Sequence, residues 1–273
     1  MDIKNTNSDH VSFSGTVPQH YDQYKGPMFF EPYALEIAKR IDPSAAKKVL
    51  EIACGTGRVS RHLRMAISSS SKLIASDISP DMLAVAKEKC TSLDIDWRII
   101  DAQDLPFEDN SIDVVVCCFG YMFVPDKQKA FAEAYRVLKP GGVFLFSTWD
   151  KLEHNAASHI YRETVKKYFE GPLSETFLLA FSMNDDGAIQ NSLEQAGFSS
   201  IKIERVDKVS MSPTAKEATY GLVQGGSVYN EIMKRNPAWI DEIKATVEKE
   251  LTEKYGASQM AAPMRALITE SKK

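Results

Sequence analysis

Short apolar runs alternate with amphipathic stretches along the middle of this chain, between about residues 48 and 149. The apolar runs are rich in Val, Ile and Leu and are too short for helices, so we expect each to form a buried strand. The predicted strands are 48–53, 72–76, 95–100, 112–117 and 143–149. The predicted helices between them are 58–67, 80–89 and 126–138. Strands that alternate with helices predict a parallel sheet covered on both faces.

Two of these helices carry local boundary signals. Ser79 stands where an N-cap is expected, and Pro80 follows at the first helical position. Pro140, Gly141 and Gly142 come directly after the helix at 126–138, and we expect them to end it.

The flanking segments have a different pattern. Residues 1–15 are polar and aperiodic, which predicts a flexible tail, and an amphipathic helix is expected at about 28–41. The elements predicted after residue 149 are helices at 154–180 and 185–196, a strand at 198–211, an interrupted helical stretch at 212–255 and a last strand at 263–269.

The predicted fold class is therefore α/β, a doubly wound, Rossmann-like sheet of seven mostly parallel strands with the last strand antiparallel. We expect one domain over residues 16–273, with its core at about 45–150. The segments 151–183 and 212–258 are expected to form helical lids beside that core.

Composition narrows the possible partners. The net charge is −4 at pH 7, with 44% hydrophobic and 26% charged residues, which is a globular balance that argues against nucleic acid or an anionic membrane. No apolar run approaches the ~18 residues of a membrane span, and the first residues lack an apolar signal core. The four cysteines include no C-x-x-C pair, so we expect reduced thiols, no metal site and a cytoplasmic location.

The segment VLEIACGTG at 49–57 is the sharpest local signal. An apolar strand enters a glycine turn, where a missing Cβ lets a ligand approach the backbone. Glu51 lies inside the apolar strand and is expected to accept hydrogen bonds near the site, because burying it unpaired is costly. Gly55-x-Gly57-x-x-Ser60, followed by Asp77, is nearly a dinucleotide fingerprint, so a nicotinamide oxidoreductase is one hypothesis.

A second acidic segment favours a different cofactor. DAQDLPF at 101–107 follows the third predicted strand, where an acidic residue can accept a hydrogen bond from an adenine amino group. The third fingerprint glycine is replaced by Ser60, which weighs against the nicotinamide hypothesis.

With these motifs the chain resembles the class I S-adenosylmethionine-dependent methyltransferases, in particular the small-molecule group that includes ubiquinone/menaquinone-type C-methyltransferases. The resemblance covers residues 49–149 through VLEIACGTG, SDISPDML, DAQDLPFEDNSIDVVV and RVLKPGG, and it returns at QAGF, residues 195–198. The chain departs from the family pattern at Ala53, where Gly is common, and at Glu51, where Asp is common.

The resemblance implies a cofactor-binding role for each residue of a set. Ala53, Gly55 and Gly57 would line the methionine portion, Asp77 would bind the ribose hydroxyls, and Ile78 and Met82 would pack on adenine. The adenine edge would meet Asp101, Ala102 and Gln103, and the sulfonium end would be bordered by Cys118, Phe119 and Met122. Tyr21 and Tyr24 would fold over the cofactor.

The resemblance also implies transfer of a methyl group from S-adenosylmethionine, with S-adenosylhomocysteine as product, to an O, N or C nucleophile of a small, partly apolar molecule. A non-catalytic module that binds the same cofactor is the third hypothesis. The residues assign no general base: His154 follows the fifth strand, but a solvated loop position suits it better. The residues do not indicate an oligomeric state either.

Overall fold

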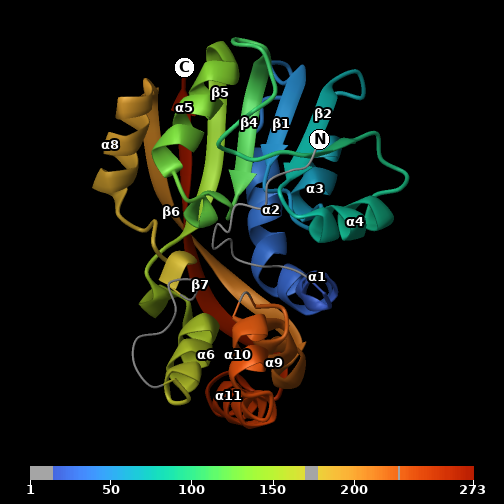
Figure 1. The fold of residues 1–273 in the computed structure, drawn as a ribbon, viewed down its shortest axis with the longest axis vertical. Helices are drawn as coiled ribbons and strands as arrows, with labels where there is room; N and C mark the ends of the chain where they lie inside the picture. Colours follow the sequence, from blue (N-terminus) through green and yellow to red (C-terminus); the bar gives the residue numbers. More distant parts are fainter. Residues whose placement is uncertain (1–14, 170–177, 227) are drawn as a thin grey trace.

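The computed structural model describes residues 15–169, 178–226 and 228–273. In this part of the chain, seven strands form one sheet in the order β3-β2-β1-β4-β5-β7-β6 (Figure 1). Only β7 is antiparallel to its neighbours, β5 and β6, so the predicted fold class is confirmed. The strands are β1 (Lys48–Ile52), β2 (Lys72–Asp77), β3 (Asp96–Ile99), β4 (Ile112–Cys118), β5 (Leu138–Trp149), β6 (Ser199–Thr214) and β7 (Ser258–Lys272).

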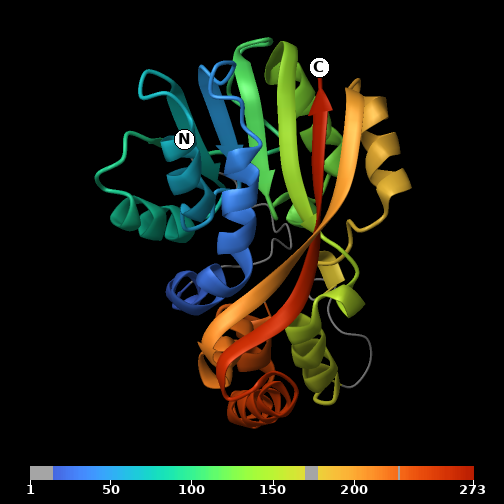
Figure 2. The same cartoon turned by 180° about the vertical axis from the view of Figure 1, so that it is seen from behind.

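Helices cover both faces of the sheet. Helices α2 and α3 pack together on one face, and α5 and α8 pack together on the other (Figures 1 and 2). The helices of the core are α2 (Glu31–Lys39), α3 (Arg58–Ala66), α4 (Pro80–Lys89), α5 (Lys127–Val137) and α8 (Asp186–Ala196). The Met82 amide donates to Ser79 Oγ at 3.3 Å, which confirms the predicted N-cap of α4. Gly197 ends α8 at a φ of 102°.

The N-terminal helical segment is longer than predicted. It runs through α1 (Val17–His20), the π-helix η1 (Tyr21–Phe30) and α2, whereas the sequence pattern predicted a start near residue 28. Pro27 inside η1 has no N–H to donate, and the wider π-helical turn accommodates it. Arg58 of α3 also fixes this segment by donating to Asp22 and to Glu31.

Three predicted boundaries in the second half are wrong or partly untested. Strand β5 begins at Leu138, so Pro140, Gly141 and Gly142 lie within it and α5 has already ended at Val137. Leu138 pairs with Ile112 across an irregular register, which draws this segment into the sheet. The helix predicted at 154–180 is α6 (Ala156–Lys166), and part of that prediction lies outside the described residues.

Strands β6 and β7 continue far beyond the sheet. They pair with each other from Ser199↔Lys272 to Thr214↔Ser258, whereas β5 covers only the part of β7 after residue 265. The free part is a two-stranded ribbon whose far end carries the helices inserted between β6 and β7 (Figures 1 and 2). These helices are α9 (Ala215–Val223), α10 (Tyr229–Arg235) and α11 (Trp239–Tyr255).

One face of this ribbon packs on the inserted helices. Met260, Ala262 and Met264 of β7 are buried and alternate with exposed residues, as expected for a strand with one covered face. The last strand was predicted only at 263–269, because alternation in a polar context gives a weaker signal than a continuous apolar run.

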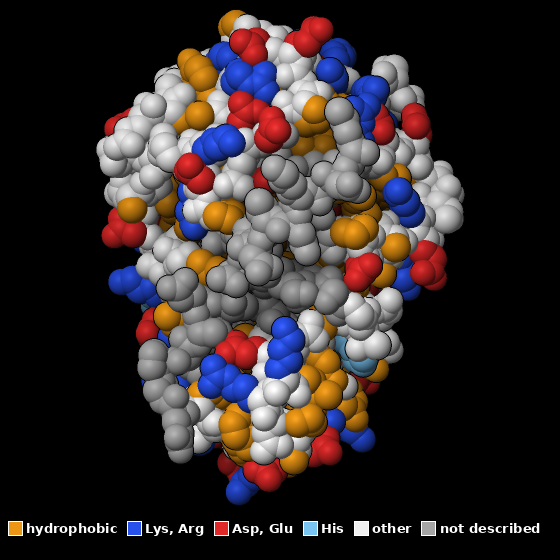
Figure 3. Space-filling view, in the orientation of Figure 1, with side chains coloured by type: hydrophobic (Ala, Val, Ile, Leu, Met, Phe, Trp, Pro, Cys, Tyr) orange, Lys and Arg blue, Asp and Glu red, His pale blue; other side chains and the backbone are white. Residues whose placement is uncertain are grey.

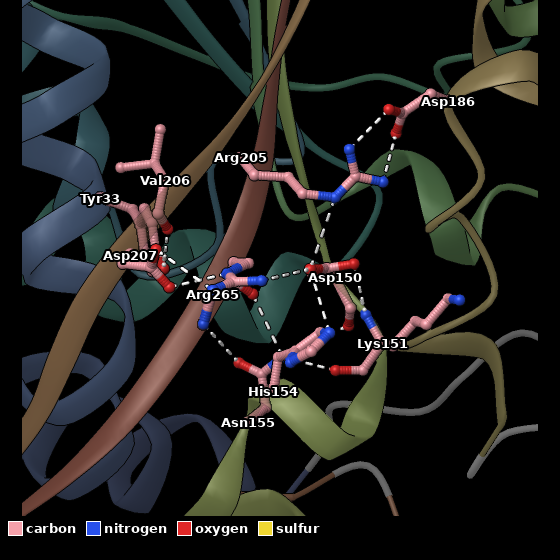
Figure 4. A network of polar contacts seen from close by, with 10 residues as sticks. All are labelled: Tyr33, Asp150, Lys151, His154, Asn155, Asp186, Arg205, Val206, Asp207 and Arg265. Carbon is pink, nitrogen blue, oxygen red and sulfur yellow. Dashed lines mark hydrogen bonds and ion pairs between the residues drawn. The ribbon is translucent and has the colours of Figure 1, made fainter.

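A buried carboxylate lies where the ribbon leaves the sheet (Figure 4). Asp150 is 1% exposed, and its Oδ2 lies 3.7 Å from Arg205 of β6 and 3.8 Å from Arg265 of β7. Arg205 also binds Asp186 through two hydrogen bonds, and Arg265 donates to Asp207 at 2.7 Å. The cluster therefore joins the end of β5 to both strands of the ribbon.

We expect Arg265→Met to lower the free energy of unfolding by about 1–3 kcal/mol, because Asp150 then keeps only one nearby arginine. Urea denaturation measures this. The control is Lys249→Met, which breaks an exposed pair with Glu253 and is expected to cost less than about 0.5 kcal/mol. Equal losses in the two variants would show that the Asp150 cluster contributes no special stability.

Candidate active site

A cavity opens at the carboxyl ends of the parallel strands, as the doubly wound topology predicts. Its wall combines the ends of β1, β2, β4 and β5, the segment after β3, and η1. The lining residues are Tyr21, Lys25, Phe30, Ile52, Ala53, Gly55, Asp77, Ile78, Ser79, Met82, Ile100, Asp101, Ala102, Gln103, Cys118, Phe119, Gly120, Met122, Phe123, Val124, Pro125, Trp149 and Ala180.

Asp77 holds the glycine turn in place. Its Oδ2 accepts from the Gly55 amide at 2.8 Å and its Oδ1 accepts from the Ser79 amide at 2.8 Å. Burial raises the pKa of the Asp77 carboxyl, and these two backbone donors oppose that effect. A carboxylate offers about four lone-pair positions, so the fixed group can still accept from hydroxyls in the cavity.

Asp101 and Gln103 form a second polar edge. Asp101 Oδ1 accepts from the Gln103 backbone amide at 2.9 Å and from its side-chain amide at 3.1 Å. Gln103 Oε1 in turn accepts from the Asp126 amide at 3.0 Å, which links this edge to the start of α5. The apolar side chains of Ile78 and Met82 also line the cavity, and Ile78 is half-exposed.

The base of the cavity is built from unusual backbone. Ala53 and Phe119 have φ values of 54° and 58°, in the left-handed region that non-glycine residues rarely adopt. Gly120 packs against Ala53 and Cys117: a Cβ there would lie 2.4 Å from Ala53 Cβ and 2.7 Å from Cys117 Sγ.

We therefore expect Gly120→Ala to destabilise the fold by about 1–3 kcal/mol, through overpacking against Ala53 and Cys117. The double variant Ala53→Gly/Gly120→Ala should recover part of this loss, because Ala53→Gly removes one of the two clashes and the left-handed strain. Thermal or urea denaturation of the four proteins in the cycle measures the coupling. Strictly additive effects would contradict contact between these positions.

One side of the cavity is aromatic. The Phe119 and Trp149 rings stack with centroids 4.0 Å apart, and Phe30 meets the Trp149 ring at 5.9 Å. Tyr21 stacks on Phe30 at 4.9 Å. These four rings come from three distant parts of the chain and give the cavity an aromatic, mostly apolar wall.

The structure places most of the sequence-predicted residues on the cavity wall, namely Tyr21, Ala53, Gly55, Asp77, Ile78, Met82, Asp101, Ala102, Gln103, Cys118, Phe119 and Met122. Tyr24, Glu51 and Gly57 lie elsewhere. The Tyr24 ring contacts Tyr220 of α9 at 5.7 Å. Gly57, at a φ of 77°, lets α3 pack closely, because a Cβ there would lie 3.0 Å from the Trp97 ring.

Glu51 is buried behind the wall rather than on it. It is 1% exposed and does not line the cavity, and the Ser60 hydroxyl of α3 is the neighbour that can donate to its carboxyl. Burial, helped by the nearby charge of Asp77, raises the pKa of Glu51 to about 8. The carboxyl is therefore mainly protonated at neutral pH, which removes the cost of a buried charge.

Sequence reasoning missed Lys25, Phe30 and Trp149. Lys25 lies in the part of η1 that precedes the predicted helix, Phe30 lies near the start of that helix, and Trp149 ends a predicted strand; none of the three carried a local motif for a ligand site. Cys118 Sγ lies 3.1 Å from Ser147 Oγ, and burial raises the pKa of this thiol to about 12, so it stays protonated. His154 lies in the Asp150 cluster, 4.0 Å from the carboxylate, and does not line the cavity.

Two searches of the described residues were negative. Within residues 15–169, 178–226 and 228–273, no three His, Cys, Asp or Glu side chains come together as metal ligands. No helix in that part of the chain has the length and apolarity needed to cross a membrane. On the face shown in Figure 3, the coloured side chains of both charges are interspersed over the surface.

Comparisons with known proteins show which family and fold this chain is similar to. A family model described as a methyltransferase domain matches residues 50–146. The chain is 35% identical, over 54% of its length and 61% of the relative's, to the ubiquinone/menaquinone biosynthesis C-methyltransferase of Pseudoalteromonas translucida. It is 31% identical, over 71% of its length and 87% of the relative's, to the demethylmenaquinone methyltransferase of Staphylococcus haemolyticus.

Other demethylmenaquinone methyltransferases are matched over 54% and 45% of their own length, so the chain spans about half of several curated relatives. Among solved structures, phosphoethanolamine N-methyltransferase 2 of Haemonchus contortus, in complex with S-adenosyl-L-methionine, superposes with a TM-score of 0.60 at 20% identity. That match covers 96% of this chain and 57% of the other, and it shows a shared fold. The identity that extends over most of the staphylococcal relative, together with the matched methyltransferase domain, shows that the chain belongs to the class I S-adenosylmethionine-dependent methyltransferases.

Proposed function

We propose that this protein transfers a methyl group from S-adenosylmethionine to an O, N or C nucleophile of a small, partly apolar molecule. The observation that carries the proposal is one cavity with two chemically different sides. The polar side contains Asp77 and Asp101, and the apolar side is walled by Phe30, Phe119 and Trp149. A donor and an acceptor that share this cavity would meet beside Cys118 and Phe119.

The polar side fits the nucleoside and amino-acid parts of the cofactor. Gly55 has a φ of 56° and open space where its Cβ would be, so a ligand can approach its backbone. We infer that Asp77 accepts from the ribose hydroxyls, that Ile78 and Met82 cover the adenine, and that the segment at 101–103 borders the adenine edge. When bound, S-adenosylmethionine supplies an electrophilic methyl group on sulfur.

The apolar side fits a planar acceptor. Stacked rings bind flat apolar molecules well, and their burial excludes water from the methyl group. The chain's main task is then to align the acceptor nucleophile with the methyl group and hold it there. Helices α6 and α9–α11 lie beyond this side of the sheet, and we propose that they select the acceptor.

The location of the protein stays a prediction. The four cysteines are free thiols in the structure, which is consistent with the reducing cytoplasm that we expect.

A turnover screen tests the proposed function. We expect the protein to release S-adenosylhomocysteine with at least one acceptor from a panel of phenols, naphthoquinols and aromatic amines, and mass spectrometry should show a gain of one methylene group on that acceptor. Naphthoquinols are included because the relatives are named demethylmenaquinone methyltransferases. Binding of S-adenosylhomocysteine without turnover on any acceptor would favour the non-catalytic module instead.

A further inference from the structure

Lys25 is a cationic residue on a cavity wall whose other charged groups, among the described residues, are Asp77 and Asp101. It stands on η1 one turn after Tyr21, and its Nζ lies 6.0 Å from the centroid of the Tyr21 ring. None of the ion pairs found in the described parts of the chain includes Lys25. The Lys25 side chain is half-buried beside the cavity, and a structural salt bridge does not account for its position there.

The backbone around Lys25 is held against the inserted helices. A Cβ on Gly221 of α9 would lie 3.0 Å from the Lys25 amide nitrogen, and a Cβ on Gly225 would lie 3.1 Å from the Tyr21 backbone. Two glycines thus let α9 pack directly on η1. Lys25 therefore sits between the donor residues and the helices that we propose to select the acceptor.

Few charged groups compete for this amine. Around it, Arg58 of α3 is paired with Asp22 and Glu31, and Lys208 of β6 is paired with Glu36. Lys244 of α11 lies over the Tyr220 ring of α9. Tyr21 lies one turn before Lys25 on η1, and the other titratable groups of the described lining are Asp77, Asp101 and Cys118. Burial is the cause that lowers the pKa of the Lys25 amine, to about 8.

We propose that Lys25 Nζ is the base that takes the proton from the acceptor during methyl transfer. This assignment rests on the proposed function. The other titratable groups of the described lining are poorly suited to the role: each of Asp77 and Asp101 already accepts two N–H donors, and burial keeps the Tyr21 hydroxyl and the Cys118 thiol protonated.

The step balances in atoms, electrons and charge. The uncharged Lys25 amine takes the proton of an acceptor O–H, N–H or acidic C–H and becomes an ammonium. The electron pair left on the acceptor forms the bond to the methyl carbon, and the pair of the broken C–S bond stays on sulfur. The cavity begins with one positive charge on sulfur and ends with one on Nζ, so no net charge is created in a buried space.

A titration tests the assignment without turnover. We expect the Lys25 signal, assigned by comparison with Lys25→Arg in ¹³C-lysine NMR spectra, to titrate at lower pH with S-adenosylmethionine bound than with S-adenosylhomocysteine bound. The sulfonium charge disfavours the ammonium, and the neutral thioether does not. A Lys25 amine that titrates at its ordinary value, above pH 10, with S-adenosylmethionine bound would overturn the proposal.

Kinetics with an acceptor from the screen supply the second test. We expect wild-type kcat/KM to rise with pH with a midpoint at or below about pH 8, and Lys25→Met to lose about a hundredfold together with that rise. Ethylamine should partly rescue Lys25→Ala. Lys39→Met, on the exposed side of α2, is the matched control and should keep the wild-type profile.

Three outcomes separate the alternatives. Full recovery in Lys25→Arg would overturn the proposal, because Arg keeps the charge but cannot serve as a base near pH 8, and Lys25 would then hold an acidic group of the ligand. If Lys25→Met binds S-adenosylhomocysteine more weakly but methylthioadenosine equally well, the acidic group held by Lys25 belongs to the donor. A wild-type protein that turns over no acceptor defeats the proposed function itself, while the NMR titration still reports on Lys25.

Discussion

Replacing Asp77 with Ala is expected to raise the dissociation constant for S-adenosylhomocysteine about 10- to 100-fold, which corresponds to about 1–3 kcal/mol. Two effects add. The cofactor loses a charged acceptor for its ribose hydroxyls, and the amides of Gly55 and Ser79 lose the oxygens that now fix the glycine turn at 2.8 Å. Isothermal titration calorimetry measures the change, and a thermal melt of the unliganded variant separates lost binding from lost folding.

The control for this prediction is Asp101→Ala, which should cost less, because the adenine keeps its apolar contacts with Ile78 and Met82. A pH series adds an independent check. The buried Asp77 carboxyl has a raised pKa, so wild-type affinity should fall as acid protonates it, and Asp77→Asn should lack that dependence. Unchanged affinity in Asp77→Ala would refute the ribose assignment.

The second large effect is expected at Glu51, as a dependence of stability on pH. The folded carboxyl keeps its proton until about pH 8, whereas the unfolded one loses it near pH 4.5. The folded state therefore binds the proton more tightly, and wild-type stability falls as pH rises from about 4.5 to 8. Glu51→Gln has no proton to lose, so its advantage over the wild type should grow by about 3 kcal/mol across this window.

Urea denaturation at pH 5, 7 and 9 measures this difference. Glu36→Gln is the control, with a pKa shift of the opposite sign. Lys208 and Arg40 lower the pKa of Glu36, so this carboxyl is ionised over the whole range and its substitution should lower the free energy of unfolding by a constant amount from pH 5 to pH 9. A difference between wild type and Glu51→Gln that does not change from pH 5 to pH 9 would show that Glu51 is ionised when buried.

The donor half of the site could be predicted from sequence because its signals are local. Short motifs of a few residues identify each of its three segments: the strand before Gly55, the strand that ends at Asp77 and the segment at 101–103. Parallel strands bring these ends to one edge, so the pattern predicts their proximity. For Glu51, the sequence pattern could not distinguish a position buried behind the cavity wall from a position on the wall.

The acceptor half could not be predicted in the same way. Phe30 and Trp149 are far apart in the sequence, and their contact depends on a helical segment that contains Gly26 and Pro27, residues that argue against a helix. The contact of Arg265 with Asp150 could not be predicted either, because Asp150 follows the end of β5 and is far from Arg265 in the sequence. Contacts of this kind are set by tertiary packing, which a single sequence does not encode as periodicity.

The unbroken passage of β6 and β7 from the sheet into the inserted helices has a mechanical consequence. A lid on flexible linkers swings independently, whereas this one is mounted on a continuous hydrogen-bonded ribbon anchored at its root by Asp150. Such a mount resists hinge motion. The N-terminal segment rests on α9 at Gly221 and is tied to α3 by Arg58, so it is joined to the same frame. We therefore expect the ribbon and its helices to act as a fixed frame around the cavity.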